Sequence, residues 1–241
     1  MRRRETGFLA GFLLLSLVQS PASPSGEIFV QATARVSGRV SVAGDYRAPA
    51  ALPVFKNRDF CGLQVANETL LIGRDRGLKN AVVILRPLAR GVAAEPKRIV
   101  LDNLRCAFVP HVQVAPVGSE LLLKNSDAIL HTVHARLDGE TLFNVGLPRW
   151  RTVTKRLGRA GVVKVDCDVL HTWMSAIIVI TDSPFYAQSD ETGLFSVERI
   201  RPGSYELQVF HERLGYRTQR LELNEGRSVN LDIVYSVETT Q

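Results

Sequence analysis

A short stretch near residue 170 combines three side chains that can bind a soft metal ion. Cys167, His171 and Met174 lie within the sequence KVDCDVLHTWMSAII, residues 164–178. A thiolate, an imidazole and a thioether together suit copper better than zinc, magnesium or calcium, and one Cys with a weak axial Met is typical of electron-transfer copper sites. The stretch therefore indicates a copper-binding loop. Core packing remains the alternative, because Cys is often a small buried hydrophobe and Met often fills gaps.

A second polar stretch lies upstream and can supply a further ligand. Residues 124–134 read KNSDAILHTVH, a polar turn followed by two histidines. We expect His131 and His134 to lie on the same face of one strand, because a strand presents alternate residues to each side. Either histidine could then complete the metal site.

The residues on either side of the candidate loop predict buried strands. Val163 and Val165 precede the loop, and the β-branched run Ile177 to Ile180 follows it. Residues of this kind favour strands. Two rigid strands could hold the ligands in place with the accuracy that a metal site demands.

The remainder of the chain also reads as short strands, with almost no convincing helical period. Gly and Pro turn signals such as Gly44-Asp45, Asp138-Gly139 and Pro202-Gly203 separate them. The predicted strands are 34–42, 81–86, 120–124, 162–166, 176–181, 205–210 and 228–235. This pattern predicts an all-β protein with one sandwich or two.

The first 22 residues have the pattern of a secretory signal peptide. Three arginines, Arg2 to Arg4, precede an apolar run from Phe8 to Val18, and small residues lead up to Ala22. We expect cleavage after Ala22 and a periplasmic or secreted protein, with an uncleaved anchor as the alternative. No membrane span is expected after cleavage.

Composition excludes several other classes of protein. The 241-residue chain is 45% hydrophobic with a formal net charge of +6, and its basic residues are scattered. A nucleic-acid partner is therefore not expected. No Ser-His-Asp or paired-carboxylate arrangement stands out, so we do not expect an enzyme.

Three cysteines in an exported protein leave one unpaired. If Cys61 and Cys106 form a disulfide, Cys167 stays free to bind metal. Two alternatives remain open. Cys106 and His111 could form part of a different metal site, or Cys61 and Cys106 could both remain buried thiols.

The sequence K-N-S-D-x-x-x-H, followed about forty residues later by C-x3-H-x2-M, resembles the cupredoxins. The resemblance covers residues 98–183 and implies a Greek-key sandwich that binds copper. Carried over residue by residue, it implies the ligands His131, Cys167, His171 and Met174. The second cysteine of the binuclear copper loop is absent, which implies a mononuclear site. The family's turn spacing favours His131, although His134 or His111 could take its place.

The C-terminal residues are similar to a different family, the carboxypeptidase regulatory-like domains. S-D-x-x-G-x-F at 189–195 and P-G-x-Y-x-L at 202–207 carry this resemblance, which implies a transthyretin-like sandwich. Its first strands match residues 36–42 and 78–85, far upstream. We therefore expect a discontinuous domain of residues 34–97 and 184–241 around an inserted cupredoxin domain, with a tandem arrangement as the alternative. The whole chain resembles exported proteins often labelled methylamine utilisation proteins.

Together these resemblances imply an extracytoplasmic mononuclear copper protein that transfers single electrons to or from a redox partner such as a cytochrome or dehydrogenase. One alternative is a periplasmic copper store or chaperone. The other is a metal-free adhesion or carbohydrate-binding protein. His211 is expected to be structural. Trp173 is expected to shield the metal from water or to offer a contact surface, with an ordinary half-buried aromatic as the alternative.

Overall fold

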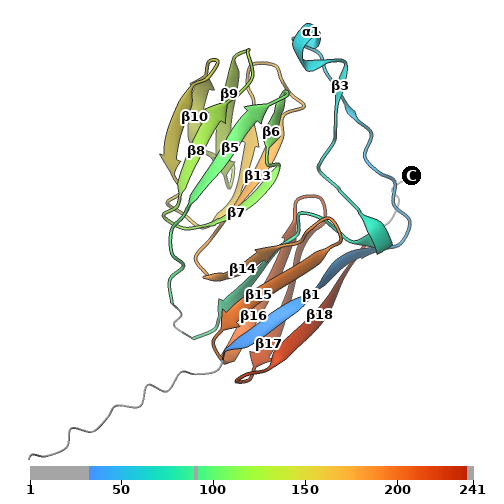
Figure 1. Cartoon of the computed structure of the whole chain (residues 1–241), viewed down its shortest axis with the longest axis vertical. Coiled ribbons are helices and arrows are strands. Elements are labelled where there is room, and N and C mark those ends of the chain that lie inside the picture. The colour runs from blue at the N-terminus through green and yellow to red at the C-terminus, as the bar shows by residue number, and fades with distance from the viewer. Residues whose placement is uncertain (1–32, 90–91, 238–241) are drawn as a thin grey trace, which may run out of the picture. The chain divides into compact units, whose positions relative to one another are not determined.

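The protein is almost entirely β in the computed structural model, which describes residues 33–89 and 92–237 (Figure 1). Helical structure in these residues is limited to α1 (Arg58–Cys61) and a 3-10 turn over Arg74–Arg76. The described residues include no helix that is long and apolar enough to cross a membrane. The predicted all-β class with two sandwiches is confirmed, whereas the predicted signal peptide lies outside the described residues.

Residues 98–181 form one sandwich, here called the site-bearing sandwich. Its larger sheet has the strand order β10-β9-β12-β13-β7, and its smaller sheet has the order β11-β8-β5-β6. The strands are β5 (Arg98–Leu104), β6 (Ala107–Val109), β7 (Val112–Pro116), β8 (Glu120–Asn125), β9 (His131–Leu137), β10 (Glu140–Leu147), β11 (Thr152–Arg156), β12 (Gly161–Asp166) and β13 (Ser175–Thr181). Alternate residues of these strands meet in one core, which includes Leu101, Leu121, Val133 and Val165.

A second sandwich, here called the flanking sandwich, combines strands from both ends of the described chain. Its sheets have the orders β15-β1-β18 and β14-β4-β16-β17. The strands are β1 (Ala34–Ala43), β4 (Val82–Pro87), β14 (Phe185–Gln188), β15 (Leu194–Ile200), β16 (Gly203–His211), β17 (Gly215–Leu223) and β18 (Ser228–Ser236). Gly38 permits the parallel pairing of β1 with β18, because a Cβ there would lie 2.0 Å from the Leu231 carbonyl oxygen.

The two strands with continuous apolar sequence, β4 and β13, are buried on both faces. Ile178 and Ile180 of β13 point into the core of the site-bearing sandwich, while Ile177 and Val179 belong to a third apolar cluster. That cluster also contains Val82 and Ile84 of β4, from the flanking sandwich. Burial on both faces explains why these strands lack the alternation of β8 and β9. All seven strands predicted from sequence are present, with ends shifted by at most two residues.

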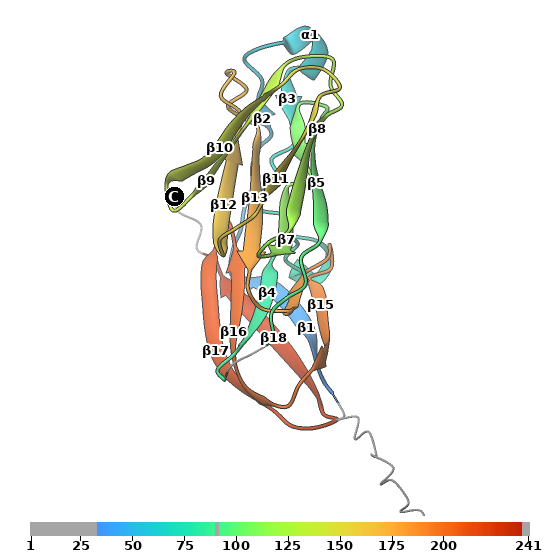
Figure 2. The ribbon, with the colours of Figure 1, turned by 90° about the vertical axis from the view of Figure 1, so that its left-hand side faces the viewer.

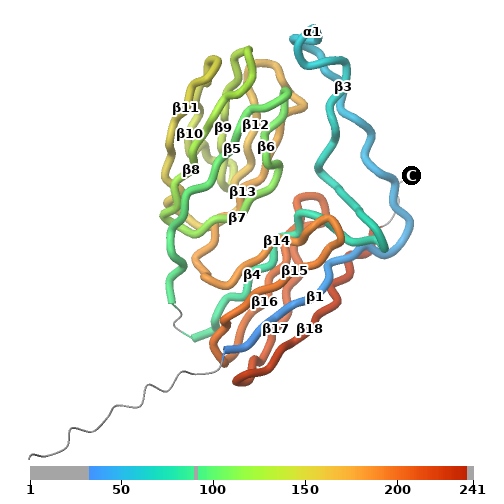
Figure 3. Tube along the Cα trace, viewed as in Figure 1, coloured from blue at the N-terminus to red at the C-terminus, as the bar shows by residue number. Residues whose placement is uncertain are grey.

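The chain between β1 and β4 makes an excursion that includes two short strands. β2 (Leu52–Pro53) pairs with β3 (Gln64–Val65), and α1 lies between them. We call residues 52–65 the tethered segment, because Cys61 is bonded to Cys106 of the site-bearing sandwich. Val54 is fully buried in the core of that sandwich. The sequence placed the whole of 34–97 with the flanking strands, and the predicted disulfide was its only sign of a contact with the inserted domain. Figures 2 and 3 show the excursion between β1 and β4.

Candidate metal centre

The four residues singled out from the sequence lie at neighbouring strand ends of the site-bearing sandwich. His131 is the first residue of β9, and Cys167 directly follows β12. His171 and Met174 lie in the loop that leads into β13, where the Met174 amide donates to the His171 carbonyl over 2.9 Å and closes a turn. β12 lies between β9 and β13 in the sheet, so the three segments meet at one end.

Three of these side chains direct potential ligand atoms at one point. The Nδ1 atoms of His131 and His171 are 3.0 Å apart, and the Cys167 Sγ lies 4.0 Å from the first and 3.8 Å from the second. All three residues are buried, with exposed fractions of 0% for His131, 4% for Cys167 and 1% for His171. These atoms therefore form a compact, water-excluded group that could hold a metal ion.

The outer nitrogens of both rings have partners that can only accept a hydrogen bond. His131 Nε2 donates to a carboxylate oxygen of Asp127 over 3.0 Å, and His171 Nε2 donates to the side-chain oxygen of Asn57 over 2.8 Å. Each ring must therefore carry its proton on Nε2. It follows that the two Nδ1 atoms present lone pairs toward each other and toward the sulfur.

Electrostatics keep both rings neutral at physiological pH. Burial, the neighbouring His131 and Lys56 lower the pKa of His171 to about 4. Burial also lowers the pKa of His131, although Asp127 opposes the shift. Two neutral lone pairs facing each other at 3.0 Å repel unless a cation lies between them. The group could therefore accommodate a positive ion.

The separations suit the bond lengths of a transition metal. Metal–nitrogen bonds of about 2.0–2.1 Å and metal–sulfur bonds of about 2.3 Å, as zinc makes them, allow one ion to reach all three atoms. Two such bonds together are longer than each of the observed separations of 3.0, 3.8 and 4.0 Å. The residues present thus fit a metal ion with two imidazole ligands and one thiolate ligand.

The sulfur of Cys167 has a hydrogen-bond donor from the neighbouring strand. The Thr132 amide donates to Cys167 Sγ over 3.4 Å, and the Thr132 hydroxyl accepts from the Asp168 amide over 2.6 Å. These bonds fix the start of the loop against β9. Hydrogen bonds to a ligating sulfur also tune the electronic properties of a metal.

Asn125 explains why a polar turn precedes His131. Its amide nitrogen donates to the carbonyls of Ile129 and Leu147, over 2.8 and 2.7 Å, and its side-chain oxygen accepts from the Asp127 amide over 3.0 Å. Asn125 and Asp127 are both buried. The turn therefore positions His131 and its partner Asp127 together.

Met174 and Trp173 lie in the same loop and are both buried. Met174 is 1% exposed and belongs to the same core cluster as Cys167. The Trp173 indole nitrogen donates to the Cys106 carbonyl over 2.9 Å, and its ring centre lies 5.1 Å from that of His171. Trp173 thus lies against the His171 ring.

The expectation that His131 and His134 share a face is wrong. Three positions separate them, and the alternation of β9 places them on opposite faces of the sheet. His134 is partly exposed and contacts the Thr141 hydroxyl and the Asp168 carboxylate, over 2.8 and 2.9 Å. It is therefore separate from the centre that contains His131.

The remaining histidines and cysteines have other partners. The disulfide between Cys61 and Cys106 is confirmed, and Cys167 is free. The alternative metal site of Cys106 and His111 is excluded, because the sulfur of Cys106 is part of the disulfide and is not available as a thiolate ligand. His111 contacts the Ser175 carbonyl and the Glu212 carboxylate instead. His211 is buried with backbone partners, as a structural histidine should be.

Three residues of the centre escaped the sequence analysis. Asp127 was visible within the polar turn but was given no role. Thr132 acts through its backbone amide, which no side-chain pattern reveals. Asn57 is 114 positions from His171, and only the folded chain brings it there.

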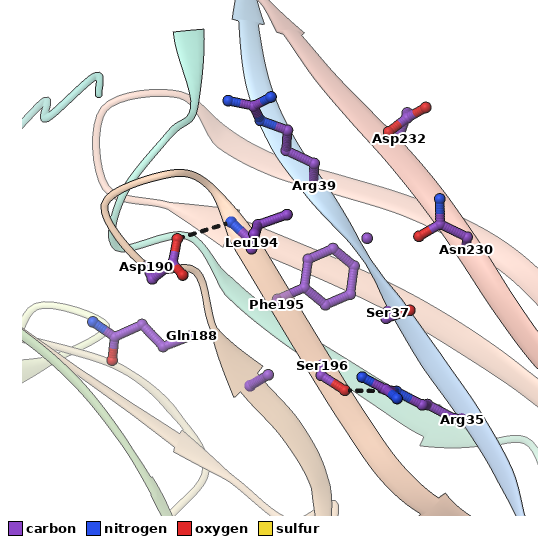
Figure 4. A pocket seen from close by; sticks show the side chains of 12 residues that line it. Arg35, Ser37, Arg39, Gln188, Asp190, Leu194, Phe195, Ser196, Asn230 and Asp232 are labelled. Atoms are coloured by element: carbon purple, nitrogen blue, oxygen red, sulfur yellow. Dashed lines mark hydrogen bonds between the residues drawn. The ribbon is translucent and has the colours of Figure 1, made fainter. Parts of the chain in front are cut away.

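A polar hollow lies elsewhere, over β1, β15 and β18 of the flanking sandwich (Figure 4). Its arginines already have partners. Arg35 contacts Ser196 and Glu198, while Arg39 donates to the backbone carbonyls of Thr192 and Arg74. The aromatic ring in its lining, Phe195, is largely buried. The hollow thus offers no exposed ring of the kind on which a sugar could stack.

Comparisons with solved structures find partial similarities. One is a purple cupredoxin from Nitrosopumilus maritimus, 21% identical over 35% of this chain and 99% of that chain, with a TM-score of 0.31. A second is a Cu-containing nitrite reductase from Thermus scotoductus, 21% identical over 40% of this chain and 25% of that chain, with a TM-score of 0.33. A third is a reduced amicyanin mutant, 19% identical over 42% of this chain and 99% of that chain, with a TM-score of 0.31. No family model and no curated protein matches the sequence.

Proposed function

We propose that this protein binds one copper ion and carries single electrons outside the cytoplasm. The proposed ligands are His131, Cys167, His171 and, as a weak axial ligand, Met174. One observation supports the proposal above all others. Two imidazole lone pairs and a cysteine sulfur converge in a buried place, while the outer ring nitrogens are committed to Asn57 and Asp127.

The chemistry of the donors favours copper over other metals. Two imidazoles, a thiolate and a thioether form a soft set of the kind that occurs in electron-transfer copper sites. A structural zinc site would more often use only cysteines and histidines. Bound copper would supply a metal that accepts and returns one electron.

The protein's own residues would keep the site rigid and dry. The Nε2 partners Asp127 and Asn57 hold both rings in one tautomer, and the Thr132 amide fixes the sulfur. Trp173 covers one side of His171. Rigid ligands limit the rearrangement that accompanies a change of charge, so such a cage suits electron transfer.

Export and a redox partner complete the proposal. A disulfide between Cys61 and Cys106 is typical of oxidising compartments, and the sequence of residues 1–22 suggests a leader. The partner would be a redox protein such as a cytochrome or dehydrogenase.

Burial of the centre favours a carrier over the other candidates. A copper chaperone or store must release its metal, whereas the three converging residues are at most 4% exposed. A set of four protein ligands would also leave no open position for a substrate, so we propose no enzymatic activity. In a metal-free protein, the two opposed lone pairs would repel each other with no cation to compensate the repulsion.

The test is a titration of the metal-free protein with Cu(II), followed by visible spectroscopy and cyclic voltammetry. We expect one ion per chain, an intense sulfur-to-copper band and reversible one-electron cycling. Cys167→Ser should abolish the band, because a hydroxyl oxygen lacks the soft donor. His134→Ala is the matched control and should leave it unchanged, because His134 lies on the opposite face of β9.

Other results would select the alternatives. Tight Cu(I) binding with ready transfer to a chelator and no coloured Cu(II) form would indicate a chaperone. No stoichiometric copper in either oxidation state, in folded protein with a free Cys167 thiol, would refute the proposed function.

A further inference from the structure

The partner of His171 comes from outside the sandwich that holds the other residues of the centre. Asn57 lies in the tethered segment, and its side-chain oxygen is 2.8 Å from His171 Nε2. His171 is 1% exposed, so its outer nitrogen is not left to water. The site-bearing sandwich alone does not supply this contact.

Several contacts hold Asn57 in place. The Lys56 ammonium donates to the Val169 carbonyl of the ligand loop over 3.1 Å. Arg58 donates to the Val54 carbonyl over 2.7 Å, and Val54 is fully buried in the site-bearing core. Asn57 itself adopts a left-handed conformation, φ 54° and ψ 38°, which asparagine tolerates better than most residues. The side chain is therefore presented by a fixed backbone.

The disulfide joins the surroundings of the two histidine rings. Cys61 ends the helix that begins after Asn57. The amide of its partner Cys106 donates to Asp127 over 2.8 Å, and Asp127 accepts from His131. The Cys106 carbonyl accepts from Trp173, which lies against His171. The disulfide thus links the segment that carries Asn57 to Cys106, whose backbone contacts both Asp127 and Trp173.

We propose that Asn57 is a positioning residue of the metal centre and that the Cys61–Cys106 disulfide holds it against His171. This inference rests on the proposed function. Asn57 keeps the His171 proton on Nε2, which leaves the Nδ1 lone pair directed at Cys167 and His131. The tethered segment is therefore a component of the site as well as a connection between strands.

The two partners differ in charge, which divides their effects. Asp127 supplies a carboxylate to His131, and a negative partner makes an imidazole more electron-rich. Asn57 supplies a neutral oxygen to His171, so it orients the ring without adding charge. Replacing Asn57 by Asp should therefore preserve the orientation and lower the reduction potential, because negative charge favours the oxidised metal.

The experiment uses the full-length protein and three variants. Asn57→Gly removes the side chain while tolerating the left-handed backbone, which alanine would strain. Asn57→Asp restores an acceptor. Asn67→Ala is the matched control, since Asn67 lies just beyond the tethered segment and its side-chain oxygen accepts from the amide and hydroxyl of Thr69.

The first measurement needs no metal. Nitrogen-15 NMR of the histidine rings in the metal-free protein should show a single Nε2–H tautomer for His171 in wild type, Asn57→Asp and Asn67→Ala. Asn57→Gly should show a mixture of tautomers, with His131 unchanged as an internal reference. An unchanged His171 tautomer in Asn57→Gly would overturn the inference.

The second measurement uses copper. Asn57→Gly should bind copper roughly 10–100-fold more weakly than wild type, as loss of a ligand's outer partner typically does. Asn57→Asp should recover the affinity with a lower potential, whereas Asn67→Ala should match wild type. Equal affinity in Asn57→Gly and wild type would count against the inference. If wild type binds no copper while Asn57→Gly still mixes tautomers, the proposed function fails and the positioning role stands.

Discussion

The two sandwiches each bury a histidine in the same charge state, yet only one builds a candidate centre. Burial lowers the pKa of His171 and of His211 to about 4. His211, in the flanking sandwich, accepts from the Arg213 amide at Nδ1 and bonds to the backbone of Lys79. His171, in the site-bearing sandwich, has a partner at Nε2 and directs Nδ1 at His131 and Cys167.

The difference between the two rings lies in the partners of their nitrogens and not in their pKa values. A strongly lowered pKa is common to both rings, and in both its main cause is burial, with smaller effects of nearby charges. Of these two rings, only His171 has an Nδ1 lone pair that faces other potential metal ligands, namely His131 and Cys167. Accounting for the partners of each nitrogen therefore separates the two cases where the pKa does not.

The two sandwiches also differ in how the chain builds them: one is continuous in sequence and the other is not. The largest expected effect concerns this difference. We predict that residues 98–183 alone fold, whereas residues 184–241 alone do not. β1 and β4 are interior strands of the two flanking sheets, so the C-terminal fragment lacks the middle of both. Amide NMR spectra of both fragments are the measurement. Well-dispersed signals from 184–241 would show instead that the flanking strands form an independent domain.

Exchanging the two histidines should separate metal binding from stability. His171→Gln should abolish the visible copper band. His211→Gln should preserve that band but lower the free energy of unfolding by about 1–3 kcal/mol, because buried hydrogen bonds are lost. Copper titration and urea unfolding of both variants measure the two effects. Loss of the copper band in His211→Gln would break the distinction drawn between the rings.

Removing the disulfide should affect both the stability of the site-bearing sandwich and the orientation of His171. Replacing Cys61 and Cys106 together by serine should lower the free energy of unfolding by about 3–4 kcal/mol, because the bond closes a loop across a sequence separation of 45. The freed tethered segment should also allow both tautomers of His171. Urea unfolding and ring NMR at low temperature check these outcomes, with the single-tautomer spectrum of His131 as the control for an intact core. A variant as stable as wild type would show that the segment docks without the bond.

The smallest expected effect is the pH dependence of stability, which has opposite signs for the two buried histidines His211 and His111. The pKa of His211 is lowered, so its contribution to stability is present above about pH 6.5 and is lost as pH falls toward 4. Burial alone would lower the pKa of His111, but the hydrogen bond and charge of Glu212 outweigh it and raise the pKa. The contribution of His111 is therefore present below pH 6.5 and lost as pH rises through its folded value.

Unfolding free energies of the metal-free protein between pH 4 and 8 measure these contributions by difference. The difference in unfolding free energy between wild type and His211→Gln should become smaller as the pH falls toward 4. The difference in unfolding free energy between wild type and Glu212→Gln should become smaller as the pH rises toward 8. A pH-independent difference for either variant would show that the corresponding ring does not titrate as its surroundings indicate.

Local patterns were sufficient for much of this protein. β-branched runs bounded by glycine and proline located the strands, because burial on a pleated sheet selects those side chains. Cys167, His171 and Met174 lie in one loop, so their spacing alone indicated a shared site. The disulfide of Cys61 and Cys106 followed from the odd cysteine count and the expected export. The error over His134 was one of strand arithmetic, since three positions reverse the face.

The sequence by itself thus determined the all-β class, the strand positions and the candidate loop with Cys167, His171 and Met174, because each depends on neighbours within a few positions. Only the tertiary structure decided which histidine of β9 faces the centre, with Asp127 behind it, and that Asn57 reaches His171. Those contacts depend on strand register and on a segment brought across 114 positions by a disulfide and a buried valine. Local sequence propensity cannot predict contacts between residues so far apart in the sequence, because the packing of the whole chain determines them.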